Sequence, residues 1–156
     1  MKGSPAKTAL RKIAENRQAR FFYEVEESLE AGVELLGSEI KSLREGKVSL
    51  AEGYAAPRGQ ELYLYKIHIA PYKPAGLFGH EPLRPRRLLL HRREIEKLSS
   101  KVRERGLALI PLSLYFKEGW AKVQLGLCYG KKQADRRESV KERQVQREIA
   151  VALRRR

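Results

Sequence analysis

The last 27 residues of the chain, 130–156, set the strongest limit on the fold, because their composition differs from that of everything before them. They contain no proline, no aromatic residue and, after Gly130, no glycine, and they hold ten Lys or Arg against four Asp or Glu. This tail therefore carries +6 of the chain's net charge of +14. Its composition is typical of a helix, so the compact core has to form from the residues that precede it.

One thin apolar stripe runs through the tail. Val145, Ile149 and Leu153 recur every four residues, which places them on a single narrow line of a helix. A helix with so little apolar surface gains little by docking on a domain, and an isolated helix of this length is marginal in water. We therefore expect the tail to be disordered alone and to become helical on a partner.

The net charge indicates that this partner is a polyanion. A charge of +14 on 156 residues is typical of a nucleic-acid-binding protein, and it argues against self-association, so we expect a monomer. An anionic membrane surface is the alternative, but it needs bulky apolar anchors, and the tail has neither Trp nor Phe. No apolar run approaches the ~18 residues of a membrane span, and residues 1–13 contain no apolar signal core. We expect a cytoplasmic protein with no membrane partner.

Before the tail, several short runs alternate apolar and polar residues, as strands do. Two candidates lie in residues 20–36, separated by Gly32, and four more lie in residues 48–58, 61–72, 107–116 and 120–128. The run over 61–72 predicts two faces. One face holds Leu62, Leu64, Lys66 and His68, and the other holds Tyr63, Tyr65, Ile67 and Ile69.

Helices are predicted between these strands. The first covers 37–46, with Ser38 as its N-cap and Glu39 in its first turn, where the helix dipole favours a negative charge. The second covers 91–105 and ends at Gly106. Residues 1–15 are expected to be mobile, with a short helix over 8–15. Residues 71–87, rich in Pro, Gly and Arg, predict a long loop of the kind that often has a function.

These elements predict an all-β core with helices. The arrangement that fits is a six-stranded antiparallel Greek-key barrel of the oligonucleotide-binding (OB) type, with about three short helices. We expect a mobile basic N-terminus over 1–14, the barrel over 15–129 and the basic tail over 130–156.

Two arginine-rich segments are candidates for contact with a nucleic acid. In PLRPRRLLLHRRE, residues 82–94, five arginines fall between Arg84 and Arg93, and the prolines hold the first three in an extended loop suited to phosphate contact. In ENRQARFFYE, residues 15–24, basic side chains lie beside Phe21 and Phe22, a combination that suits unstacked bases. The alternatives are a solvated helix start for the first segment and, for the second, a strand with one of the two rings in the core.

Little in the sequence predicts catalysis. His68, His80 and His91 have no partner at metal-binding spacing, and neither GxxxxGK[ST] nor GxGxxG is present. The single cysteine, Cys128, excludes an internal disulfide and a cysteine-based zinc site. We expect no enzyme activity, no metal and no cofactor. A ribonuclease site assembled in space from His and Lys stays open as an alternative.

With these residues in view, the chain resembles the small protein B (SmpB) family. The resemblance covers nearly everything from residue 15 onward, in family order. It rests on these strings: ENRQARFFY at 15–23, LEAGVELLGSEIKSLREGK at 29–47, HIAPY at 68–72, EPLRPRRLLLHRREI at 81–95, LIPLSLYFKEGWAKVQLGL at 109–127 and GKKQADRRE at 130–138.

The resemblance implies a function in RNA binding. The family binds the tRNA-like domain of transfer-messenger RNA (tmRNA) and brings it to stalled ribosomes in trans-translation. It reaches alanyl-tRNA synthetase and elongation factor Tu indirectly, through the tmRNA. The tail is implied to enter the empty decoding centre and mRNA channel of the ribosome and to form a helix there.

The resemblance also implies site residues. On the barrel, the positions implied to face tmRNA are Asn16, Arg17, Arg20, Phe21, Glu30, Lys41, Arg86, Arg87 and Leu89. In the tail, the positions implied to contact the ribosome are Lys131, Lys132, Asp135, Arg136, Arg137, Lys141, Arg143, Ala152 and Leu153.

Two positions depart from the family pattern. Phe21 and Phe22 stand where the family has His followed by Asp or Glu, and Ala134 stands where it often has His or Tyr. The first change replaces a polar group with a ring that can stack, and the second removes a ring. The alternative function is another OB-type protein, ribosome-associated or similar to an initiation factor, which would bind bare small subunits without a specific small RNA.

Overall fold

The computed structural model describes residues 10–130 and, in the tail, Gln144, Arg147 and Ile149. These three tail residues are helical and exposed. The predictions for residues 1–9, for the disorder of the tail before binding and for the nine tail positions implied to contact the ribosome lie outside the described residues. Among the residues described, no helix is long and apolar enough to cross a membrane.

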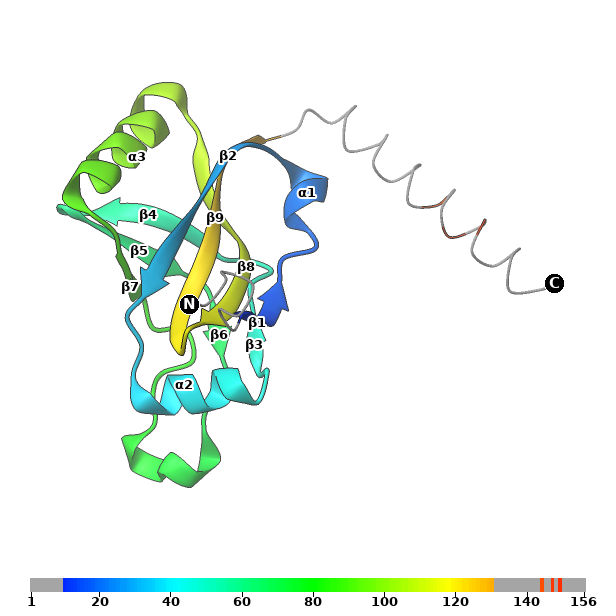
Figure 1. The fold of residues 1–156 in the computed structure, drawn as a ribbon, viewed down its shortest axis with the longest axis vertical. Coiled ribbons are helices and arrows are strands. Elements are labelled where there is room, and N and C mark those ends of the chain that lie inside the picture. The colour runs from blue at the N-terminus through cyan, green and yellow to red at the C-terminus, as the bar shows by residue number, and fades with distance from the viewer. Residues whose placement is uncertain (1–9, 131–143, 145–146, 148, 150–156) are drawn as a thin grey trace, which may run out of the picture.

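Six antiparallel strands form a closed ring, which confirms the predicted six-stranded OB-type barrel (Figure 1). The order around the ring is β8-β4-β5-β7-β2-β9, and pairing of β9 with β8 closes it. The ring strands are β2 (Tyr23–Val33), β4 (Tyr54–Arg58), β5 (Glu61–Tyr65), β7 (Arg86–Leu89), β8 (Ala108–Lys117) and β9 (Trp120–Gly130).

The barrel interior is filled by side chains from alternate strand positions. Leu62, Leu88, Val123, Leu125 and Leu127 each have no exposed surface. Their strand neighbours point to the outside of the barrel. There Ile110 and Cys128 are buried in a second cluster with Ala19, and the rest of this outer set is more open to solvent. That outer set is where a partner can bind.

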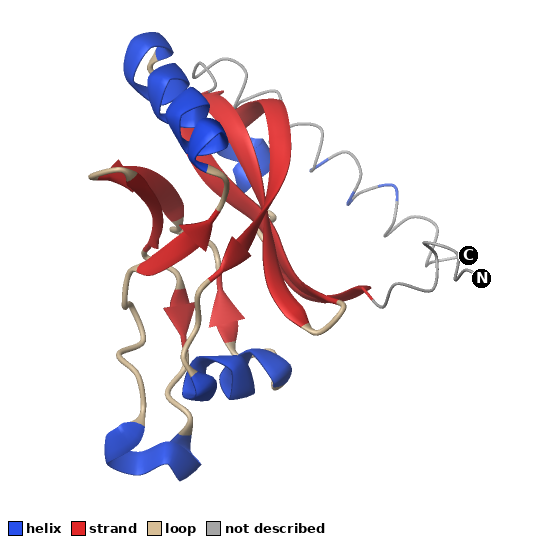
Figure 2. Ribbon diagram, turned by 60° about the vertical axis from the view of Figure 1, so that its left-hand side comes forward, coloured by secondary structure: helices blue, strands red, loops and turns tan. Residues whose placement is uncertain are grey.

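Helices close the two ends of the barrel, with α3 at one end and α2 at the other (Figures 1 and 2). The prediction for α3 (Arg92–Arg105) is confirmed: Ile95 and Leu98 are buried, and Gly106 ends the helix with a φ of 65°. A glycine suits this position because it adopts left-handed backbone without strain. The other helices are α1 (Ala19–Phe22), α2 (Gly37–Arg44) and a 3₁₀ segment, Lys73–Phe78.

The N-terminal prediction is wrong from residue 10 onward. A strand, β1 (Leu10–Glu15), replaces the predicted helix over 8–15, and it pairs with β8 from Leu10 opposite Lys117 to Glu15 opposite Ser113. The reason lies in the long strand β8. Strand β4 pairs with β8 at Leu109, and the far half of β8 would otherwise present an unpaired edge.

Two further predictions about strands are wrong. Gly32 does not divide residues 20–36, because β2 continues through it, and the helix α1 precedes that strand. Residues 48–58 form two strands, β3 (Val48–Ser49), which pairs with β6 (His68–Ile69), and β4. Between β3 and β4, Gly53 lies so close to Ile67 that a Cβ there would stand 2.1 Å from the Ile67 Cδ1 atom.

The predicted faces of residues 61–72 are correct only at the start. Leu62 and Leu64 are buried, but Lys66 adopts a φ of 59° and reverses the alternation, so that Ile67 and Ile69 are buried next. A single left-handed residue therefore moves Lys66 and His68 to the solvent side. Hydrophobic alternation cannot reveal such a residue.

The N-cap predicted at Ser38 is also wrong. The N-cap of α2 is Leu36, whose backbone N–H donates to the Glu39 Oε1 atom at 2.8 Å. The Ser38 hydroxyl instead bonds the Nδ1 atom of His80, also at 2.8 Å. Glu39 is in the first turn, as predicted, but it is fully buried.

Candidate RNA-binding face

The pairing register brings outward residues of four strands onto one continuous surface. Tyr115 of β8 pairs with Lys122 of β9, Lys122 with Gly32 of β2, and Gly32 with Leu89 of β7. Directly paired residues point to the same side of a sheet. These residues therefore form one row across the outside of the barrel, although Tyr115 itself is only 6% exposed. We call this surface of β8, β9, β2 and β7 the outer face.

Glu30 lies in the neighbouring row of the outer face, opposite Gln124. Its carboxylate accepts a hydrogen bond from the Tyr115 hydroxyl, and the Lys117 Nζ atom lies 3.5 Å from its Oε1 atom. The Tyr115 hydrogen bond and the charges of Lys117 and Lys122 lower the pKa of Glu30, although partial burial opposes them. Glu30 is thus an ionised acceptor at neutral pH, held in place by Tyr115 and Lys117.

A carboxylate of this kind has a specific chemical use. It repels phosphate, so it adds nothing to general attraction for RNA, but it can accept from the amino group of a base. Burial and the Glu30 carboxylate raise the pKa of Tyr115, so its hydroxyl stays protonated and continues to donate. The pair presents a fixed acceptor toward solvent.

Beside Glu30, the outer face is hollowed by about 450 Å³. Leu89, 46% exposed, stands at this hollow with its side chain lying across Gly32, where a Cβ would come within 3.2 Å of the Leu89 Cβ. Arg87 and Lys122 also line it, and so do two further carboxylates, Glu61 and Glu94. The structure therefore brings together three of the nine predicted barrel positions, Glu30, Arg87 and Leu89.

Lys122 was missed by the sequence predictions of site residues. The signal was present, because Lys122 alternates with the core residue Val123 in β9 and so had to face outward. The sequence does not show which residues of the adjacent strands lie beside Lys122. Only the register shows that Lys122 lies between Tyr115 and Gly32.

The arginine cluster of residues 84–93 is divided between interior and surface. Arg86 is 1% exposed, its Nε atom donates to the Glu39 Oε2 atom at 2.6 Å, and its Nη1 atom donates to the Ile67 carbonyl at 2.6 Å. The predicted RNA contact of Arg86 is therefore wrong. Burial lowers the pKa of Arg86, and the Glu39 charge partly offsets that effect.

Its two neighbours in the predicted loop also have protein partners. Arg84 binds the Glu39 Oε1 atom at 2.6 Å. Arg87 binds Glu34 at 2.9 Å but keeps 37% of its side chain exposed, so it is the member of this group that can still meet a ligand. All three of these arginines bind glutamates of the protein, and Arg86 is fully buried, against the prediction of an extended phosphate-binding loop.

A second group of predicted residues lies at the far end of β2. Asn16 is 7% exposed, and its amide group donates to the carbonyls of Leu50 and Pro111 at 3.3 and 3.0 Å. It therefore holds the turn before α1, and the buried amide gives no direct RNA contact. Arg17 and Arg20, on the turn and on α1, are exposed. Seven strand residues separate α1 from Glu30, about 23 Å along β2.

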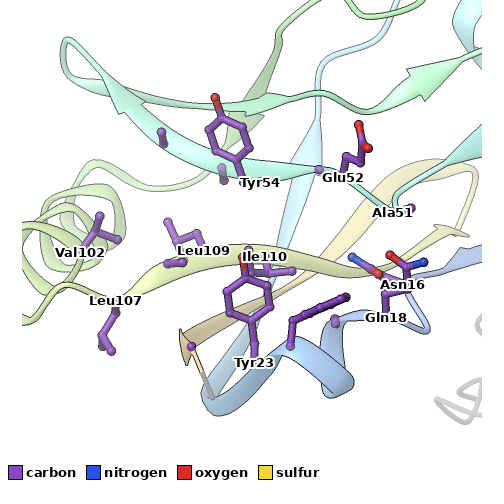
Figure 3. A pocket seen from close by; sticks show the side chains of 17 residues that line it. Asn16, Gln18, Tyr23, Ala51, Glu52, Tyr54, Val102, Leu107, Leu109 and Ile110 are labelled. Carbon is purple, nitrogen blue, oxygen red and sulfur yellow. The ribbon is translucent and has the colours of Figure 1, made fainter. Parts of the chain in front are cut away.

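The two phenylalanines lie in α1, and neither fills the core as a strand position would. Their ring centroids are 4.7 Å apart at 89°, and Phe22 is 40% exposed. Phe22 lines a cleft of about 680 Å³ between α1 and β8 on one side and β4 on the other. Figure 3 shows Tyr23 and Tyr54 on opposite sides of this cleft, with Asn16 toward its end.

Lys41 lies apart from both groups. It is exposed on α2, with its Nζ atom 5.4 Å from the centroid of the Tyr72 ring. The nine predicted barrel positions therefore fall into four places: the outer face, the region of α1, the helix α2 and, for Arg86, the interior.

The described residues contain no group of His, Cys, Asp and Glu able to hold a metal ion. His80 is buried, with its Nε2 atom 2.9 Å from the Ile69 carbonyl, while His68 and His91 are exposed on other elements. Burial raises the pKa of the Cys128 thiol to about 11, so it is not a nucleophile at neutral pH.

The closed barrel, the cations Arg87, Lys117 and Lys122 on its outer face and the net charge of +14 define the class of protein: an OB-type barrel of the kind that binds nucleic acids. A family model described as "SmpB protein" matches residues 13–155. The chain belongs to the SmpB family.

Individual relatives cover almost the whole chain. An SsrA-binding protein of Myxococcus xanthus is 54% identical over 99% of this chain and 96% of its own length. One of Gloeothece citriformis is 49% identical over 99% of both. A solved chain described under "tmRNA-SmpB: a journey to the center of the bacterial ribosome" is 46% identical, with a TM-score of 0.65 over 81% of this chain and 93% of that one.

Proposed function

We propose that this protein is an RNA-binding adaptor that binds the tRNA-like domain of tmRNA and delivers it to stalled ribosomes for trans-translation. The barrel binds tmRNA, and the basic tail contacts the decoding centre and mRNA channel of the ribosome. The protein acts as a monomer in the cytoplasm. It has no catalytic role of its own and reaches alanyl-tRNA synthetase and elongation factor Tu through the RNA.

The observation that carries the proposal is the environment of Glu30. Its carboxylate is held by Tyr115 and Lys117, on an open surface shared with Leu89, Arg87 and Lys122 and with two further carboxylates, Glu61 and Glu94. A surface made only to attract phosphate would have no use for it. A surface that recognises one structured RNA does have a use for the carboxylate, because the carboxylate distinguishes base edges and rejects misplaced phosphates.

The first experiment compares two glutamate variants of the full chain for binding to a labelled transcript of the tRNA-like domain. Electrostatic attraction alone predicts that removing any carboxylate tightens binding. Base recognition predicts the opposite for Glu30→Ala, a loss of about 5- to 150-fold, corresponding to ~1–3 kcal/mol for one base contact. The control is Glu104→Ala, an exposed carboxylate on α3, which is expected to bind as the wild type or slightly more tightly.

Unchanged or tighter binding by Glu30→Ala would contradict the proposed recognition surface. Sequencing the RNA that copurifies with residues 1–130 separates the proposal from the alternative function. One dominant tRNA-like RNA supports the adaptor. A mixture of ribosomal RNA fragments would indicate the general ribosome-associated or initiation-factor-like protein.

A further inference from the structure

The single tryptophan of the chain, Trp120, stands at the tip of the β8–β9 hairpin and is 72% exposed. Leaving the largest apolar side chain in solvent contributes nothing to folding. Exposed tryptophans are, however, among the residues that contribute most to binding when a partner covers them. Among the described residues, no ring contact includes Trp120.

The position of Trp120 is fixed by its backbone. Glu118 and Gly119 form the two-residue turn, with φ values of 53° and 83°, the left-handed pair that matches the twist of a tight hairpin. Trp120 follows at once and pairs with Lys117 across the hairpin. The ring is therefore presented on a short, well-defined tip.

The register places Trp120 on the outer face. Leu10 of β1 pairs with Lys117, and Lys117 pairs with Trp120, so these three residues form a row. The next row along the strands contains Lys122, and the row after that contains Glu30. Two strand steps separate neighbouring rows, so Trp120 is about 13 Å along β9 from the position opposite Glu30.

The chemistry around the ring points to RNA. Lys117 pairs directly with Trp120, and Lys122 lies in the next row, where Lys12 of β1 faces the same way opposite Tyr115. Lys117 also binds Glu30, and Lys12 binds Glu15. Cations beside an exposed ring are the combination that binds an unpaired nucleotide, because the ring stacks on the base and the amines neutralise phosphate. A base inside a regular helix already has both faces covered, so the ligand has to be an extruded or terminal base.

We propose that Trp120 is a stacking platform for one unpaired base of the tRNA-like domain of tmRNA, with Lys117 and Lys122 holding the adjacent phosphates. This inference rests on the proposed function and extends it to a named contact. The tmRNA is the occupant because the Trp120 row continues the outer face. The tail leaves the barrel at Gly130, at the opposite end of β9, about 33 Å away along the strand.

The test uses the intrinsic fluorescence of the full-length protein, in which the only tryptophan is Trp120. The tRNA-like transcript is titrated in, while the anisotropy of a label on the RNA independently reports binding. Stacking on a base is expected to quench the tryptophan emission in step with the anisotropy. Trp120→Ala is expected to weaken binding by about 5- to 150-fold, as for loss of one stacked base. Trp120→Phe, which keeps a ring, is expected to retain most of the affinity.

Leu83→Ala is the matched control, because Leu83 is 51% exposed on the loop before β7, away from the row that contains Trp120. It is expected to bind as the wild type. If the anisotropy rises but the emission stays constant and Trp120→Ala binds normally, the inference is wrong and the proposed function stands. If the wild type gives no rise in anisotropy, the proposed function and the inference both fail.

Discussion

Glu39 is a fully buried carboxylate shared by two arginines that lie 45 and 47 residues further along the chain. Burial alone would raise its pKa. Hydrogen bonds from Arg84 and the Leu36 amide, together with the charge of Arg86, lower the pKa of Glu39 below its ordinary value of 4.5. Glu39, a charged residue of the kind usually found at the surface, thus links α2 to β7 inside the protein through its ion pair with Arg86.

Removing this carboxylate is expected to destabilise the fold strongly. Glu39→Ala leaves Arg86 buried without its partner, which costs about 3–5 kcal/mol. The free energy of unfolding, measured by urea denaturation, checks this. The matched control is Glu34→Ala, which removes the partner of the half-exposed Arg87 and is expected to have a much smaller effect. Equal losses in the two variants would contradict the importance given to the buried pair.

The same pair predicts a dependence of stability on pH. A carboxylate whose pKa is lower in the folded protein contributes its full stabilisation above the unfolded pKa and loses it as the pH falls through the folded pKa. The wild type should therefore lose stability as the pH falls below about 4.5. Glu39→Gln should lose less over that interval. Parallel curves for the two proteins would show that Glu39 is not responsible.

At the scale of elements, β1 extends the folded part of the chain beyond the barrel ring. It continues the sheet along the half of β8 that β4 does not pair with. It also places Leu10 and Lys12 beside the outer face, so an N-terminal segment expected to be mobile from residue 1 to 14 contributes to both stability and surface.

Two truncations test where the folded domain begins. Removing residues 1–9 leaves β1 intact and is expected to leave the thermal unfolding midpoint almost unchanged. Removing residues 1–15 exposes the edge of β8 and is expected to lower the midpoint by several degrees and to promote aggregation. If both truncations melt like the full chain, β1 contributes little to the stability of the barrel.

At the scale of the whole molecule, the folded surface and the most concentrated positive charge lie in different parts of the chain. The barrel has a defined outer face, whereas the tail carries +6 in 27 residues and begins where β9 ends. The lysines of the outer face lie near the start of β9, and the basic tail follows its end. These two groups of cations suit two different RNA surfaces.

Removing residues 131–156 is expected to separate the two activities. Affinity for the tRNA-like transcript should change only a few-fold, and rescue of stalled ribosomes in a reconstituted translation reaction should be lost. The slope of log affinity against log salt is a further measure, because each neutralised phosphate contributes about 0.7–0.9. Equal slopes for the full and truncated proteins are expected, and a clearly smaller slope for the truncated protein would mean that the tail also binds tmRNA.

The sequence by itself determined the barrel class, the helix α3 and the strands β8 and β9, because these depend on local periodicity and on glycine at helix ends. It also determined the basic character of the tail. Glu30 and Leu89 as site positions remain a prediction from the family motifs. Such signals lie within a few residues of one another and can be read along the chain.

Only the tertiary structure decided which charges face solvent. Arg86 and Arg87 are adjacent, yet one is buried against Glu39 and the other lies on the outer face, because a strand directs neighbours to opposite sides. Likewise, Trp120 and Glu30 belong to one surface only through the register of β9 with β8 and β2. Pairing between distant segments sets that register, and no local pattern contains it.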